Sequence, residues 1–186
     1  MKTHKTSLVG KSLDDFLDIC DIHNVDSYRA EQIFNWIYKN KINDFESFKN
    51  IPKSFLNLLK EQHTIHPLIF VRSTKSDSRL TNKFLFKTQS GALIESVLMN
   101  EGSRTTLCLS TQVGCALDCK FCATAKMGFI DNLDSGEIVD QFLLISKMLS
   151  KPITNVVFMG MGEPFLNYSN VIKSAKLLHD PNGINL

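Results

Sequence analysis

The sequence lacks the features that define several protein classes. It contains no apolar run approaching the roughly 20 residues that a membrane-spanning helix needs. Among 186 residues it has only 5 cysteines, 5 prolines and 9 glycines, which excludes a disulfide-stabilised miniprotein and a collagen-like chain. Its first residues, MKTHKTSLVG, lack the apolar core of a signal peptide. We therefore expect a globular cytoplasmic protein whose cysteines are reduced or hold a metal.

The sequence also lacks a large net charge, since the total is only +2. Residues 67–130 are the exception, with 8 Lys and Arg against 4 Asp and Glu. Such a basic segment can meet phosphate, although it also suits a solvated surface. Nucleic acid is therefore one candidate partner at this point.

The hydrophobic pattern of the first third of the sequence predicts a small helical domain. Ser12 is a candidate N-cap for a first helix, and Ser27 opens a second helix that has a clear apolar stripe. Pro52 suits the first position of a third helix. We expect Cys20 and Trp36 to be core residues, because free cysteine and tryptophan are usually buried for packing reasons.

Short runs rich in β-branched and aromatic residues follow, and they predict a β-rich connecting region. The predicted strands are Ile69–Val71, Lys83–Thr88 and Leu93–Met99, with a hairpin turn at residues 89–91. Glu95 is a lone carboxylate in an otherwise apolar row of the last strand. It either points to water from an edge strand or lies partly buried in a site, where it could take up a proton.

The last third of the sequence alternates strands and helices. The predicted strands are Thr105–Ser110 and Asn155–Met159, the second one buried, and the predicted helices are 135–149 and 169–179. This alternation is typical of a parallel α/β architecture. The chain is thus expected to comprise a helical domain (1–66), a β-rich connecting region (67–104) and an α/β core (105–186).

Three cysteines, Cys115, Cys119 and Cys122, lie within eight residues of one predicted loop. Clustered thiols at such short spacing normally ligate a metal. A structural zinc site needs a fourth ligand, and with no histidine nearby only Cys108 could supply it. A [4Fe–4S] cluster held by three cysteines instead leaves one iron free to bind a small molecule such as S-adenosylmethionine. Zinc and iron–sulfur both remain open on these residues alone.

Longer motifs carry a resemblance to a known family. The Cys-x-x-x-Cys-x-x-Cys spacing, with Phe121 before the third cysteine, resembles the radical S-adenosylmethionine signature. Gly160–Pro164 is similar to the glycine–glutamate–proline element that receives the methionine amino group in that superfamily. Thr106–Ala125 and Ile153–Pro164 resemble the radical adenine-C2 RNA methyltransferases of the RlmN type. Tyr28–Tyr38 is similar to the N-terminal accessory domain of the same family.

The resemblance implies a fold class, cofactors and site residues. The fold would be α/β, with the helical domain and a β-hairpin region followed by the first two strand–helix units of a partial (β/α) radical S-adenosylmethionine barrel. The implied [4Fe–4S] ligands are Cys115, Cys119 and Cys122, and the implied S-adenosylmethionine contacts are Gly162 and Glu163. Glu95 would be the proton acceptor, and Cys108 a resolving thiol that releases the methylated base from a covalent adduct.

The resemblance also implies a reaction and its partners. In this family a cysteine near the C-terminus carries a methyl group to adenine C2 of large-subunit ribosomal RNA and of transfer RNA. An electron donor must reduce the cluster, and no membrane is involved.

The sequence departs from the family pattern at its end. No cysteine follows Cys122, and the sequence stops at Leu186 after two strand–helix units. We therefore expect a fragment or a truncated product that can assemble the cluster site but cannot complete methyl transfer. The alternative is a non-catalytic RNA-binding module stabilised by zinc on Cys108 and the three clustered cysteines. The identity of the metal separates these two hypotheses.

Overall fold

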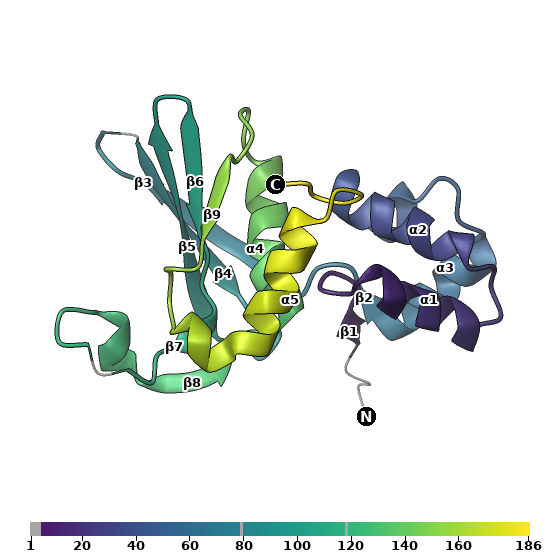
Figure 1. Ribbon diagram of the computed structural model, residues 1–186, viewed down its shortest axis with the longest axis horizontal. Coiled ribbons are helices and arrows are strands. Elements are labelled where there is room, and N and C mark those ends of the chain that lie inside the picture. The colour runs from purple at the N-terminus through teal and green to yellow at the C-terminus, as the bar shows by residue number, and fades with distance from the viewer. Residues whose placement is uncertain (1–4, 79, 118) are drawn as a thin grey trace.

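The structure, a computed structural model, describes residues 5–78, 80–117 and 119–186. A mixed β-sheet lies at one end of its long axis and a helical domain at the other, with α4 (Ser135–Lys147) and α5 (Tyr168–His179) between them (Figure 1). None of the helices in these ranges is long and apolar enough to cross a membrane.

Three α-helices and several short elements build the helical domain. They are β1 (Thr6–Ser7), α1 (Leu13–Ile22), α2 (Tyr28–Phe34), η1 (Asn35–Lys39), η2 (Phe45–Ser47), α3 (Lys53–Gln62) and β2 (His63–Thr64). The two short strands pair in parallel and so tie the two ends of this domain together. The second predicted helix does form, but its last turn, η1, is a π-helix that the apolar pattern alone does not reveal.

The predicted helix starts are close to the observed ones. The N-cap prediction for Ser12 is confirmed, because its hydroxyl accepts a hydrogen bond from the Asp15 amide at 3.2 Å while the Asp15 carboxylate accepts from the Ser12 amide at 2.7 Å. Ser27 precedes α2 without a side-chain cap. Pro52 stands one position before the helix that it was expected to begin, as the N-cap of α3.

The two expected core residues of the helical domain differ in exposure. Cys20 is fully buried, as predicted. Trp36 is only partly buried, because its indole N–H donates to Asn50 Oδ1 at 2.5 Å in an exposed position. A tryptophan with one apolar face and a hydrogen-bonded edge commonly sits at such a boundary.

A single five-stranded sheet has the order β3-β4-β5-β6-β9. The strands are β3 (Ile69–Lys75), β4 (Thr81–Lys87), β5 (Leu93–Glu101), β6 (Arg104–Cys108) and β9 (Asn155–Val157). The predicted β-hairpin region is therefore continuous with the α/β core, because β5 pairs with β6. Only β6 and β9 are parallel, so the sheet is mixed. The last strand is half-buried rather than fully buried as predicted.

Helices cover one face of this sheet. The stripe predicted for α4 is confirmed at Ile138, Phe142 and Ile145, which are buried, but the helix ends at Lys147, two residues before the predicted end. They pack in one core with the inward-facing side chains of the sheet, among them Ile94 and Leu107. The opposite face of the sheet has no helix over it within the described residues.

A second, two-stranded sheet carries the cysteine loop. Its strands are β7 (Gln112–Gly114) and β8 (Phe129–Asn132), and between them lies the short helix η3 (Thr124–Met127). The sequence patterns did not indicate β7 and β8, because three- and four-residue strands are too short to show a periodicity. The pairing of β7 with β8 therefore holds the two ends of the cysteine loop together.

A buried ion pair joins the segment after the helical domain to the core. His66 Nδ1 contacts Asp140 on α4, and His66 Nε2 lies 3.1 Å from the carbonyl oxygen of Ile42. Burial lowers the pKa of His66, but the Asp140 contact and the Ile42 carbonyl outweigh it, and the net direction is upward. Complete burial raises the pKa of Asp140, while His66 and the Leu68 amide oppose that rise. Two acceptors on the ring favour the doubly protonated imidazolium.

We predict that this pair makes the stability of the protein depend on pH. Because folding raises the pKa of His66, its contribution is complete below pH about 6.5, the value for an unfolded histidine, and is lost as pH rises through the folded value. Asp140→Asn should lower the free energy of unfolding by about 3 kcal/mol at pH 6 and flatten this dependence. Urea unfolding between pH 6 and 9 measures both effects. The exposed Asp131→Asn is the matched control, and equal losses in the two variants would contradict the assignment.

Candidate functional site

Glu95 and Cys108 project from the same face of the main sheet. In the β5–β6 register Val97 lies opposite Cys108, and Glu95 is two residues from Val97 on the same side of its strand. This is the face without a helix. Because β5 has β4 on one side and β6 on the other, Glu95 does not belong to an edge strand, so this one of the two alternatives is wrong.

Glu95 is partly exposed and has a partner. Lys83 Nζ on β4 lies 3.0 Å from Glu95 Oε1, and the side chains of the two residues are 50% and 40% exposed, respectively. Solvent screens a pair this accessible, so it contributes less than about 1 kcal/mol to stability. The pair therefore positions the Glu95 carboxylate but adds little to the stability of the sheet.

Cys108 occupies a drier position on the same face. Only 8% of its surface is exposed. Burial raises the pKa of its thiol, and a hydrogen bond from the Met159 backbone opposes that rise only in part. The thiol therefore keeps its proton near neutral pH, and any reaction at sulfur needs a neighbouring group to accept that proton.

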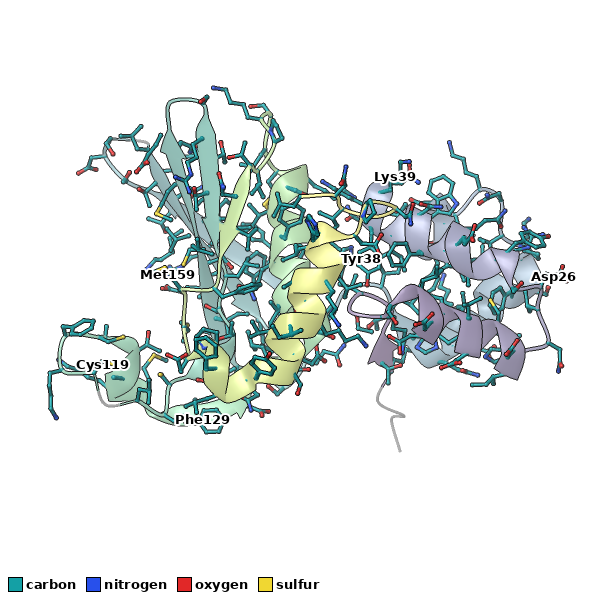
Figure 2. All side chains as sticks on the ribbon, in the orientation of Figure 1. Asp26, Tyr38, Lys39, Cys119, Phe129 and Met159 are labelled. Carbon is teal, nitrogen blue, oxygen red and sulfur yellow. The ribbon has the colours of Figure 1, made fainter. Side chains whose placement is uncertain are left out.

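The three clustered cysteines lie in the loop that follows β7. Figure 2 shows Cys119 in this loop, which projects away from both the sheet and the helices. All three thiols are free and partly exposed, and the Cys122 amide donates to the Cys119 carbonyl oxygen at 3.0 Å. Backbone hydrogen bonds from Ala125 and Thr124 lower the pKa of Cys122. A lowered thiol pKa favours the thiolate, the form that ligates metals.

The donor set fits an iron–sulfur cluster by its chemistry. Three thiols within one short loop are soft ligands, and the Cys122 thiol is already biased towards the thiolate. Within the described residues, which exclude the position before Cys119, no three Cys, His, Asp or Glu side chains already meet at metal-binding distances. Metal sites commonly acquire their geometry only when the metal binds.

Gly160 and Gly162 let the segment after β9 lie directly against the residues that follow β6 and against β7. A Cβ on Gly160 would lie 2.7 Å from the Leu109 carbonyl carbon, and one on Gly162 would lie 2.5 Å from Gln112 Cβ. Gly162 also has a φ of +98°, which side-chain-bearing residues rarely adopt. Glu163 is thereby held beside β7, where its amide donates to Gln112 Oε1 at 2.9 Å. Its carboxylate accepts from the Phe165 amide at 3.0 Å.

A buried polar network that the sequence patterns missed supports this arrangement. Gln141 on α4 bonds to both the amide and the carbonyl of Ser110, at 2.9 Å each. Asn167 donates to the carbonyl oxygens of Thr111 and Leu133, at 2.7 Å each. The one available signal was a polar residue, Gln141, inside an otherwise apolar helix stripe.

We predict that Gly162→Ala destabilises the protein by about 1–3 kcal/mol, because it adds both a strained backbone and a clash with Gln112. Gly102→Ala is the matched control, since Gly102 also has a positive φ but a Cβ there would meet no atom within 4 Å. Urea unfolding compares the two variants. Equal losses would mean that the contact with Gln112 contributes nothing.

Three comparisons relate this chain to known proteins. Residues 6–65 match the family described as the ribosomal RNA large subunit methyltransferase N-terminal domain. The probable dual-specificity RNA methyltransferase RlmN of Thermotoga neapolitana is 43% identical over 93% of this chain and 50% of its own length. The protein of the same name from Leptospira interrogans is 41% identical over 100% of this chain and 53% of its own length. A crystal structure of a radical SAM methyltransferase from Sphaerobacter thermophilus matches with a TM-score of 0.91 and 38% identity, covering 97% of this chain and 54% of that one.

These matches extend from the helical domain through the sheet and the cysteine loop. The chain spans about half the length of the relatives it matches. The mixed α/β fold is that of a radical SAM methyltransferase, here with a helical domain at one end. Over nearly its whole length the chain is therefore similar to about half of each of these methyltransferases, and its residues 6–65 match the N-terminal domain of the ribosomal RNA large subunit methyltransferase family.

Proposed function

We propose that this chain provides the cofactor-binding and proton-transfer part of an RNA adenine-C2 methyltransferase. The observation that carries the proposal is the shared open face of Glu95 and Cys108, next to the strand ends that lead into the cysteine loop. A partly exposed carboxylate and a largely buried thiol on one sheet face can act on the same substrate base. The named relatives, which are probable dual-specificity RNA methyltransferases, support RNA as that substrate.

The proposed organisation follows the three sequence regions. Residues 1–66 form an accessory domain, residues 67–104 supply the strands that carry Glu95, and residues 105–186 begin a radical SAM core. The proposed substrates are large-subunit ribosomal RNA and transfer RNA, and a separate electron donor reduces the cluster.

Five residues are assigned to the cofactors. Cys115, Cys119 and Cys122 hold a [4Fe–4S] cluster, since they are the three clustered thiols of the chain. Glu163 pairs its carboxylate with the ammonium group of S-adenosylmethionine, and Gly162 lets the backbone approach the ligand closely. Together the bound cluster and S-adenosylmethionine supply methyl groups and one-electron radical chemistry.

Glu95 and Cys108 are assigned to the base. Glu95 accepts the proton that leaves adenine C2, and the Lys83 ammonium holds its carboxylate on the open face. Cys108 acts as the resolving thiol that releases the methylated base from its covalent attachment to the enzyme. Because burial raises the pKa of Cys108, its proton must pass to an acceptor on this face before the sulfur can attack.

Methyl transfer to the base needs one further residue. The family resemblance places a methyl-carrying cysteine after the cluster ligands, and no cysteine follows Cys122 in these 186 residues. The fifth cysteine, Cys20, is fully buried in the helical domain and is no candidate. None of the five cysteines in these 186 residues is therefore assigned the methyl-carrying role.

We predict that protein made from its native gene and purified without oxygen contains about four irons and four sulfides per chain, with visible absorbance. Cys119→Ala should lose most of this iron, because one of three thiolate ligands is gone. Cys20→Ala is the matched control and should keep it. A colourless protein with one zinc per chain would overturn the proposal and favour the zinc-stabilised RNA-binding module.

In an enzyme that carries the methyl-bearing cysteine, we predict that Cys108→Ala assembles the cluster normally but accumulates protein covalently joined to RNA, because release of the base is blocked. Denaturing gels with radiolabelled RNA measure the adduct, and iron analysis measures the cluster. Loss of iron in this variant would mean that Cys108 is a metal ligand. Normal iron without any adduct would contradict its role in release.

A further inference from the structure

A β-bulge places Arg72 on the face that carries Glu95 and Cys108. In the β3–β4 register Phe70 lies opposite Phe86 and Arg72 lies opposite Leu85, so Val71 is an extra residue between them. Without this bulge, strict alternation would put Arg72 on the same face as Phe70, towards the covered side. Bulges often re-aim a side chain next to a functional site.

The sheet register also fixes how far Arg72 is from Glu95. Leu85 lies opposite both residues, Arg72 on one side and Glu95 on the other. The three residues form one row across the open face, so the backbones of Arg72 and Glu95 are two strand spacings apart, roughly 10 Å. That span is comparable with one nucleotide, from its base to its phosphate.

A second unpaired cation stands in the adjoining row. Lys87 lies opposite Leu93 and therefore shares the face of Glu95, one strand away from it. Arg72 and Lys87 are exposed, and within the described part of the chain neither has an ion-pair partner. Lys83 is paired with Glu95. On this face β3, β4 and β5 therefore present three cations against two carboxylates, and the second carboxylate, Glu101, lies opposite Arg104 at the far end of β5.

We propose that Arg72 and Lys87 form a docking site for the RNA backbone, binding phosphates beside the nucleotide whose base reaches Glu95. The inference rests on the proposed function only in taking RNA as the partner. An arginine fork and a lysine ammonium suit phosphate oxygens, and they position an RNA without reading its sequence. Exposed flanking apolar residues such as Ile69 offer the bases and sugars a surface to lie against.

The test is RNA binding by the native protein, measured by fluorescence anisotropy with a labelled hairpin of about 20 nucleotides at several salt concentrations. Arg72→Met and Lys87→Met should each weaken binding roughly three- to tenfold and reduce the slope of log affinity against log salt by about 1. Hairpins of different sequence should lose the same factor. Arg72→Lys should recover part of the loss.

Lys75→Met is the matched control. Lys75 is on the same strand and carries the same charge, but its partner Asn82 places it on the opposite face. Its removal should change affinity less than twofold. Equal weakening of RNA binding by all three variants would mean diffuse charge attraction and would overturn the proposed site. The site would also be overturned if Arg72→Met and Lys87→Met bound RNA as tightly as the wild type. Displacement of the hairpin by polyglutamate at equal charge concentration would also overturn it, in favour of an acidic protein partner.

The binding measurement needs neither S-adenosylmethionine nor turnover, so it can fail separately from the proposed function. If the protein methylates RNA while its Arg72→Met and Lys87→Met variants bind RNA as tightly as the wild type, only this inference is wrong. If RNA binding depends on the two residues but the protein contains no iron and methylates no RNA, only the proposed chemistry is wrong. In an active protein, Arg72→Met should raise KM for RNA and leave kcat unchanged.

Discussion

The hydrogen bonds of Ser110 hold the whole candidate site in register. Its hydroxyl donates to the Glu95 carbonyl at 2.5 Å and accepts from the Met161 amide at 2.9 Å, while Gln141 satisfies its backbone on both sides. Ser110, two residues beyond the end of β6, thus connects β5, the segment after β9 and α4. An unsatisfied buried polar group costs about 1–3 kcal/mol, so these bonds allow few alternative arrangements. The cysteine loop, Gly162 and Glu95 all take their positions from this point.

Local patterns were sufficient to predict the longer helices, the five strands of the main sheet and the cysteine motif, but not the short strands β7 and β8. The apolar stripe of α4, the capping residue Ser12 and the strand that carries Glu95 could all be located from spacing and residue type. The cysteine loop was recognisable because three thiols at such short spacing normally ligate a metal. These features depend on residues near each other in the chain.

Features that depend on pairing between distant segments could not be predicted. Nothing in the sequence near Glu95 indicates that Lys83 will lie beside it, or that β5 has neighbours on both sides. The bulge at Val71 changes the face of Arg72 through a single inserted residue, and a simple alternation rule gives the wrong face there. Gln141 was visible only as a polar interruption, and its partners lie about thirty positions away.

Because Trp36 lies in the helical domain, the tryptophan fluorescence of this protein reports on that domain. It is the only tryptophan in the sequence, and it lies in the π-helical turn of the helical domain with its indole N–H bonded to Asn50. The sheet and the cysteine loop contain no such chromophore. Emission from the indole therefore reports on one end of the molecule, and circular dichroism is needed to follow the other.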